Sequence, residues 1–209
     1  MAHHIQNLIS QGEHQHLDFK YAISDARHIA ESFSAFANAG GGKLLIGVRD
    51  NGTISGVRTD EEMYMVDAAA AHYCTPPVGY SVRRWQCQGK TVLEVDIPEG
   101  ADKPYLAKRK DKPPAAYVRI ADRDVKASVI QLMVWEKQKN PSGLVITDTE
   151  HVKRLMSQLE KQPCITISAA CKLLIFSYKK ALRLVADLVY LNILEIEYQN
   201  DKVLLRTKK

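Results

Sequence analysis

Apolar and polar residues alternate with a spacing of two in short segments of the first 140 residues. In segment 16–22 (HLDFKYA), this alternation places Leu17 and Phe19 on one face of a predicted strand, and Asp18 and Lys20 on the other. Other β-prone runs are 44–48, 53–57, 79–86, 90–97 and 116–120.

Between these runs, apolar residues recur at helical spacing in 24–39, 60–73 and 125–139. Ser24 offers an N-cap for the first of these helices, and three consecutive glycines follow it. Segment 98–114 contains several prolines and a glycine and predicts a loop. The expected fold class is α+β, with helices packed on a mixed, mostly antiparallel sheet.

After residue 140 the pattern changes to three helices and a hairpin. The predicted helices cover 147–161, a short segment capped by Ser168, and 178–192, and the hairpin follows at 193–205. This order is typical of a winged helix-turn-helix. Segment 140–143 (NPSG) combines a turn dipeptide with a glycine. We therefore predict a nucleic-acid-binding domain at 1–139, a linker at 140–146 and a winged helix-turn-helix domain at 147–209.

The composition agrees with a two-domain intracellular protein. The chain has 209 residues, of which 45% are hydrophobic and 25% charged, the balance of a soluble globular protein. No apolar run approaches the ~20 residues that span a bilayer, so no membrane partner is expected. The four cysteines lack zinc-finger spacing, which favours free thiols in a reducing cytosol and a cytoplasmic location.

The net charge of +5 is concentrated near the C-terminus. Residues 1–140 hold 18 Lys and Arg against 17 Asp and Glu, whereas 141–209 hold 11 against 7. Segment 103–112 adds five cations against one anion and supplies further candidate nucleic-acid contacts. These contacts are Lys108, Arg109, Lys110 and Lys112. A solvated surface without a polyanionic partner is the alternative.

The last predicted helix carries its cations at its start. Lys179, Lys180 and Arg183 lie in the first turns, which in a helix-turn-helix face the major groove. Ser177 is a candidate N-cap and phosphate donor. Because such proteins commonly bind paired half-sites, we expect a homodimer. The alternative is a winged helix used for protein contact or dimerisation without DNA.

A second group of candidate residues is acidic and lies near the N-terminus. Glu13 stands at the entrance of the first strand, Asp18 lies within it, and Asp50 ends a second strand that could lie beside it. Three carboxylates can hold Mg²⁺ or Mn²⁺ for phosphodiester hydrolysis, and Lys20 can offset the developing negative charge. An ion pair between Asp18 and Lys20 at the surface is the alternative. Histidines 3, 4, 14 and 16 fit no zinc signature, which favours a mobile terminus.

Several motifs occur in a fixed order between about residues 10 and 128. They are Glu13 with Asp18-Phe19-Lys20, then Phe36-Ala37-Asn38, the segment 41–48 (GGKLLIGV), Asp50-Asn51-Gly52, Pro104-Tyr105-Leu106 and Tyr117-Val118-Arg119. In this order they resemble the Schlafen-AlbA family. The resemblance implies a nucleic-acid-binding α/β domain. It further implies that, in the nuclease members, the equivalents of Glu13 and Asp18 and a later Asp form a metal-dependent RNase site. This sequence departs from that pattern at Asp18, which is one methylene shorter than the Glu often found there.

Three functions fit these observations. The preferred function is DNA binding, as a transcriptional regulator, with DNA or RNA as the partner class. The second is a metal-dependent nuclease that uses Glu13, Asp18, Lys20 and Asp50 as its catalytic residues, with Glu13, Asp18 and Asp50 as the metal ligands. The third is an interaction scaffold without catalysis. We predict binding and do not expect cleavage, and whether the chain is an enzyme is open at this point.

Overall fold

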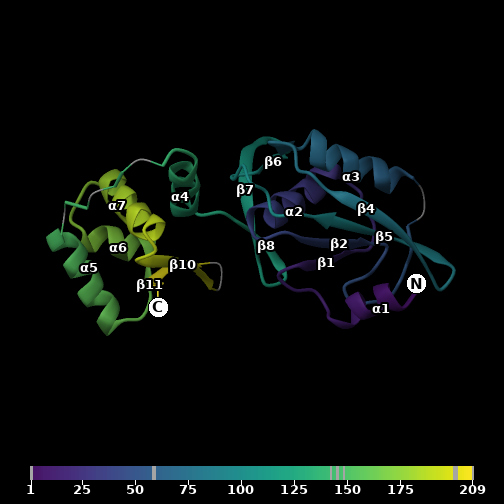
Figure 1. Cartoon of the computed structure of the whole chain (residues 1–209), viewed down its shortest axis with the longest axis horizontal. Helices are drawn as coiled ribbons and strands as arrows, with labels where there is room; N and C mark the ends of the chain where they lie inside the picture. Colours follow the sequence, from purple (N-terminus) through teal and green to yellow (C-terminus); the bar gives the residue numbers. More distant parts are fainter. Residues whose placement is uncertain are drawn as a thin grey trace. The chain divides into compact units, whose positions relative to one another are not determined.

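The computed structural model in Figure 1 describes residues 2–57, 60–141, 143–144, 146–147, 149–199 and 202–208. The chain divides into two compact units, Met1–Ala127 and Ser128–Lys209. The predicted α+β class is confirmed, because helices pack on mostly antiparallel sheets. Within the described residues, no helix is long and apolar enough to cross a membrane.

The first sheet of unit 1 has the order β1-β2-β5-β4. Its strands are β1 (Leu17–Lys20), β2 (Gly42–Ile46), β5 (Lys90–Ile97) and β4 (Ser81–Cys87). The β1 and β2 strands are parallel, and the other neighbours are antiparallel. Because β1 and β2 run in the same direction, their amino ends lie side by side, and so do their carboxyl ends. This arrangement determines where the predicted site residues lie.

One face of this sheet is covered by α1 (Ala2–Ser10). Ile5 is fully buried in a cluster with Leu17 and Phe19, the apolar face that the alternation in β1 predicts. The Nε2 atom of His4 lies 3.0 Å from Oε2 of Glu94. The prediction of a mobile N-terminus was therefore wrong, because the apolar residues of α1 are buried against the sheet.

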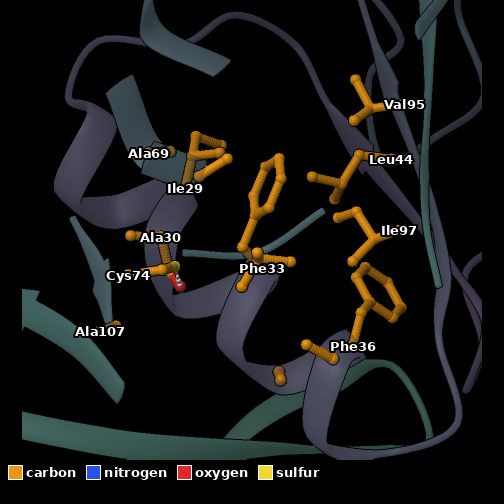
Figure 2. Packing of buried hydrophobic residues seen from close by; sticks show 14 of the residues in the cluster. Ile29, Ala30, Phe33, Phe36, Leu44, Ala69, Cys74, Val95, Ile97 and Ala107 are labelled. Atoms are coloured by element: carbon orange, nitrogen blue, oxygen red, sulfur yellow. Dashed lines mark hydrogen bonds between the residues drawn. The ribbon is translucent and has the colours of Figure 1, made fainter. Parts of the chain in front are cut away.

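The opposite face packs against α2 (Ala26–Asn38). Figure 2 shows Phe33 and Phe36 of this helix reaching toward Leu44, Val95 and Ile97 of the sheet. The helix begins one residue later than predicted. Its N-cap is Asp25, which accepts a hydrogen bond from the backbone N–H of Arg27 at 2.8 Å. Helix α3 (Glu61–Ala71) packs beside α2.

A second sheet covers the other side of α2, in the order β3-β6-β7-β8. Its strands are β3 (Cys74–Thr75), β6 (Leu106–Arg109), β7 (Lys112–Ile120) and β8 (Arg123–Lys126). The predicted loop at 98–114 is thus partly a β-hairpin. Its turn contains Asp111 in the left-handed region, with φ 53°.

Buried hydrogen bonds join α2 to this second sheet. The side-chain amide of Asn38 donates to the carbonyl oxygens of Tyr105 and Tyr117, both at 2.9 Å. Its Oδ1 accepts from the backbone N–H of Tyr105 at 2.9 Å. Asn38, which lies in one of the sequence motifs, therefore fixes the path of the chain on both sides of the hairpin.

Unit 2 contains four helices and a three-stranded sheet in its described residues. They are α4 (Val129–Lys139), α5 (Thr149–Lys161), β9 (Ile165–Thr166), α6 (Ile167–Leu173), α7 (Tyr178–Tyr190), β10 (Leu194–Gln199) and β11 (Lys202–Thr207). The sheet order is β10-β11-β9. Helix α6 is capped by Thr166, whose Oγ1 accepts from the N–H of Ala169 at 3.2 Å, and not by Ser168.

Helix α4 belongs to unit 2, although the sequence placed it in the first domain. Ile130 and Val134 are buried in the same cluster as Val185 and Leu188 of α7. The division between the units falls between Ala127 and Ser128. The predicted linker at 140–146 lies after α4, within unit 2, and its residues Ser142 and Val145 are outside the described residues.

Candidate functional site

Asp18 and Lys20 lie on the face of β1 opposite Leu17 and Phe19, as the alternation in the sequence predicts. The Nζ atom of Lys20 lies 2.5 Å from Oδ2 of Asp18, so the two residues form an ion pair. The pair is not a surface pair, because the Asp18 side chain is 3% exposed. Such burial demands further partners for the carboxylate.

A further partner is Arg119, which β7 brings from the second sheet. Its guanidinium is 2% exposed and donates from Nη2 to Oδ1 of Asp18 at 3.2 Å and from Nη1 to Oδ1 of Asp124 at 2.9 Å. The hydroxyl of Ser32 donates to the other oxygen of Asp124 at 2.6 Å. Burial lowers the pKa of Arg119, but Asp18 and Asp124 outweigh this and raise it above its ordinary value. Arg119 therefore stays charged.

Glu13 lies against Asp18 at the start of β1. Its Oε1 accepts from the backbone N–H of Phe19 at 2.9 Å. Burial and a hydrogen bond with Asp18 raise the pKa of the Glu13 carboxyl from 4.5 to about 7. Near neutral pH this carboxyl is thus partly protonated and can donate its proton to the Asp18 carboxylate. A carboxyl with such a pKa can both accept and donate a proton during a reaction.

Asp50 does not join these two carboxyls. It is exposed and lies in the turn after β2, where it lines a recess with Tyr21, Arg49 and Asn51. Because β1 and β2 are parallel, Glu13 precedes the amino end of the pair, whereas Asp50 follows the carboxyl end. The structure therefore brings Glu13, Asp18 and Lys20 together and leaves Asp50 at the opposite end of the strands.

The acidic group does not fit a divalent metal ion. Among the residues that the structure describes, no three His, Cys, Asp or Glu side chains are grouped to hold one. Asp18 also faces two cations, Lys20 and Arg119, which oppose the approach of Mg²⁺ or Mn²⁺. The pair of carboxyls is suited to proton transfer rather than to metal binding.

The basic segment of unit 1 lies along the β6–β7 hairpin. Lys108, Lys110 and Lys112 are exposed. Two of the four predicted contact residues donate hydrogen bonds to backbone carbonyls of the protein. The Nζ of Lys108 donates to the carbonyl of His72 at 2.8 Å, and Arg109 donates to the carbonyl of Pro113 at 3.0 and 3.1 Å. The exposed turn of the hairpin thus presents Lys110 and Lys112.

The candidate basic residues of unit 2 lie together on α7. Lys179, Lys180 and Arg183 are exposed, while Leu182 and Val185 are buried on the opposite side. The Nζ atom of Lys180 lies 3.8 Å from the centre of the Phe176 ring. Ser177 occupies the N-cap position, and its side chain makes no capping hydrogen bond. The structure therefore groups all four candidate residues at the start of one amphipathic helix.

Comparison with known proteins identifies the family of unit 1. Residues 13–128 match the model of the family described as Schlafen, AlbA_2. The chain belongs to this family. The matched span starts at Glu13 and contains the whole acidic group. It ends where unit 2 begins, so family membership assigns nothing to α7.

Solved structures give further similarities. A crystal structure of a protein from Corynebacterium diphtheriae is 17% identical, with a TM-score of 0.48, over 82% of this chain and 32% of that one. The chain thus spans about a third of that protein's length, from the 32% coverage. The solution NMR structure of the N-terminal domain of a RecG-related protein from Nitrosomonas europaea is 25% identical, with a TM-score of 0.44, over 60% of this chain and 94% of that domain. No curated protein sequence matches the chain.

The sequence analysis missed the central role of Arg119. It named this residue only as the end of a family motif. An arginine within the otherwise apolar run of β7, where its neighbours Tyr117 and Val118 are buried, was the available signal. A charged residue in such a run predicts a buried ion pair, although not its partner.

Proposed function

We propose that the chain binds duplex DNA through α7 and acts as a transcriptional regulator. The observation that carries the proposal is the group of exposed cations Lys179, Lys180 and Arg183 at the start of an amphipathic helix. Helices α5, α6 and α7 precede the β10–β11 hairpin, and β9 pairs with β11. This order supports a winged helix-turn-helix with α7 as its recognition helix.

The chemistry of these residues fits the major groove. Lysine and arginine can contact phosphates and the O6 and N7 acceptors of guanine. The Ser177 hydroxyl, which makes no capping bond, can donate to a phosphate. The proposal includes a homodimer that places two copies of α7 on paired half-sites. It also includes a cytoplasmic location, which the four free cysteines favour.

Two triple variants of the full chain test this proposal. Changing Lys179, Lys180 and Arg183 to Ala should weaken binding of a duplex by ~3 kcal/mol at low salt, about 100-fold. The control changes three exposed cations of α5 to Ala and removes the same charge. These are Lys153, Arg154 and Lys161. The control should bind within about threefold of the wild type. Equal losses of duplex affinity in both variants would mean that α7 contributes only non-specific positive charge, and would contradict its proposed role as a recognition helix.

A second candidate function is cleavage of nucleic acid at the acidic group. The observation that favours it is the Glu13 carboxyl, with a pKa raised to about 7, against Asp18. Substitution of Asp18 is a poor test, because it also removes a partner of the buried Arg119. The better variant is Glu13→Gln, which keeps the shape of the side chain and removes its proton transfer.

The cleavage assay uses labelled tRNA, single-stranded RNA and duplex DNA, with Mn²⁺, with Mg²⁺ and with EDTA. We expect retention of nucleic acid without cleavage in every arm. Cleavage by the wild type that falls at least ~100-fold in Glu13→Gln would support the second candidate. Cleavage that Glu13→Gln leaves unchanged would place any catalyst elsewhere in the chain.

A further inference from the structure

A recess lies at the carboxyl end of the parallel pair β1 and β2, away from Glu13. It is open, has a volume of about 370 Å³, and is lined by Tyr21, Arg49, Asp50 and Asn51. Tyr21 directly follows β1, and Arg49 comes shortly after β2. The carboxyl ends of adjacent parallel strands are a common position for ligand sites in α/β proteins.

The two largest side chains of the recess are in contact with each other. The guanidinium carbon of Arg49 lies 4.3 Å from the centre of the Tyr21 ring, a cation–π contact. The Tyr21 residue is nevertheless 38% exposed. Each of the two side chains carries a planar group, and groups of this kind can stack on another planar group.

The backbone holds Arg49 in place. Its N–H donates to the carbonyl of Thr53 at 3.0 Å, and its carbonyl accepts from the N–H of Gly52 at 2.7 Å. The N–H of Thr53 also donates to Oδ1 of Asn51 at 3.0 Å. The tight turn 49–53 therefore gives the recess a fixed wall, and little ordering is required when a ligand binds.

We propose that this recess is a base-stacking subsite for single-stranded nucleic acid. Nucleobases stack on tyrosine rings and on arginine guanidinium planes whatever their sequence. The recess contains one cation, Arg49, and one anion, Asp50, so phosphate attraction is largely balanced and the planar faces dominate. The Asp50 carboxylate can accept from an exocyclic amino group of the base. In a duplex these base faces are covered, so the subsite selects unpaired strands.

This subsite lies in unit 1 and acts independently of the proposed duplex binding by α7. The test measures binding of fluorescein-labelled, single-stranded RNA and DNA of eight nucleotides, and of a duplex, to the full chain. Tyr21→Ala should weaken binding of both single strands by about tenfold and leave the duplex unchanged. Tyr21→Phe is the matched control and should bind within twofold of the wild type, because the stacking face remains. Arg49→Lys keeps the charge but not the plane and should weaken single-strand binding.

Ultraviolet crosslinking provides a second measurement. An RNA of eight nucleotides with one 5-iodouridine should crosslink to Tyr21, identified by mass spectrometry of the peptides. A folded Tyr21→Ala protein that binds single strands as the wild type does would overturn the proposal, as would equal losses in Tyr21→Ala and Tyr21→Phe. Failure of the wild type to bind either single strand would also overturn it. If single-strand binding is lost only in the variant of α7 in which Lys179, Lys180 and Arg183 are changed to Ala, this proposal is overturned. The separate proposal that α7 binds duplex DNA would not be affected by that result.

Discussion

Replacing Glu13 with Gln should change how folding stability depends on pH. In the folded protein, burial and the hydrogen bond with Asp18 raise the pKa of Glu13 from 4.5 to about 7. The folded state therefore holds a proton that the unfolded state releases between these values. For a carboxyl with a raised pKa, this stabilisation is fully present below pH 4.5 and is lost as the pH rises through 7.

The size of the effect follows from the same values. A rise in pKa from 4.5 to about 7, at ~1.4 kcal/mol per pH unit, corresponds to at most ~3.5 kcal/mol. Solvent screening of a partly exposed carboxyl reduces this to ~1–2 kcal/mol. The glutamine side chain stays neutral and can still accept from the N–H of Phe19. The variant should therefore gain ~1–2 kcal/mol over the wild type between pH 5 and pH 8.

Urea unfolding of both proteins, followed by circular dichroism at pH 5, 6, 7 and 8, measures this gain. The histidines and the other carboxyls are common to both proteins, so their titrations largely cancel in the difference. An unfolding free-energy difference that stays constant across the series would refute the raised pKa of Glu13. An NMR titration of the Glu13 carboxyl carbon near its ordinary value would refute it as well.

Three further predictions concern stability. Asn38→Ala removes the buried amide that joins α2 to Tyr105 and Tyr117, and should cost ~3–5 kcal/mol in urea unfolding; a cost under ~1 kcal/mol would contradict this. Ile175 has φ 55° and is 71% exposed, so Ile175→Gly should relieve strain and raise the unfolding free energy by ~1 kcal/mol. A fragment of residues 128–209 should unfold cooperatively, whereas 140–209, which lacks Ile130 and the rest of α4, should be at least ~3 kcal/mol less stable. Equal stability of the two fragments would place α4 outside the core.

The sequence predicted the parts of the fold that depend on neighbouring residues. The alternation in 16–22 correctly placed Asp18 and Lys20 on the face opposite Leu17 and Phe19, because strand geometry is local. Local geometry also accounts for Asn192, which adopts the left-handed region with φ 58°. The short side chain of asparagine makes this conformation accessible.

The parts that depend on distant pairing were not predictable. Arg119 meets Asp18 across 101 residues, and no local pattern specifies such a contact. The turn residues between 98 and 114 indicated a loop, but β6 pairs with β7 and becomes a strand. Asp50 was expected near Glu13 from the order of the motifs along the chain, which specifies neither the neighbours of a strand nor its direction. The parallel pairing of β1 and β2 separates the two residues.

The position of α4 illustrates a further limit. Its helical spacing was recognised, and Asn140-Pro141 correctly marked where it ends. The end of a helix is not the end of a domain, however, and only tertiary packing shows that Ile130 and Val134 are buried with α7.

The salt dependence of duplex binding tests the central proposal most directly. Each cation that neutralises a phosphate contributes ~0.9 to the slope of log affinity against log salt concentration. If Lys179, Lys180 and Arg183 of α7 contact DNA, changing all three to Ala should lower the slope by ~2–3 and weaken binding at every salt concentration. The variant that lacks the α5 cations should keep the wild-type slope. A folded α7 variant with the slope and affinity of the wild type would contradict the proposal that this helix binds DNA.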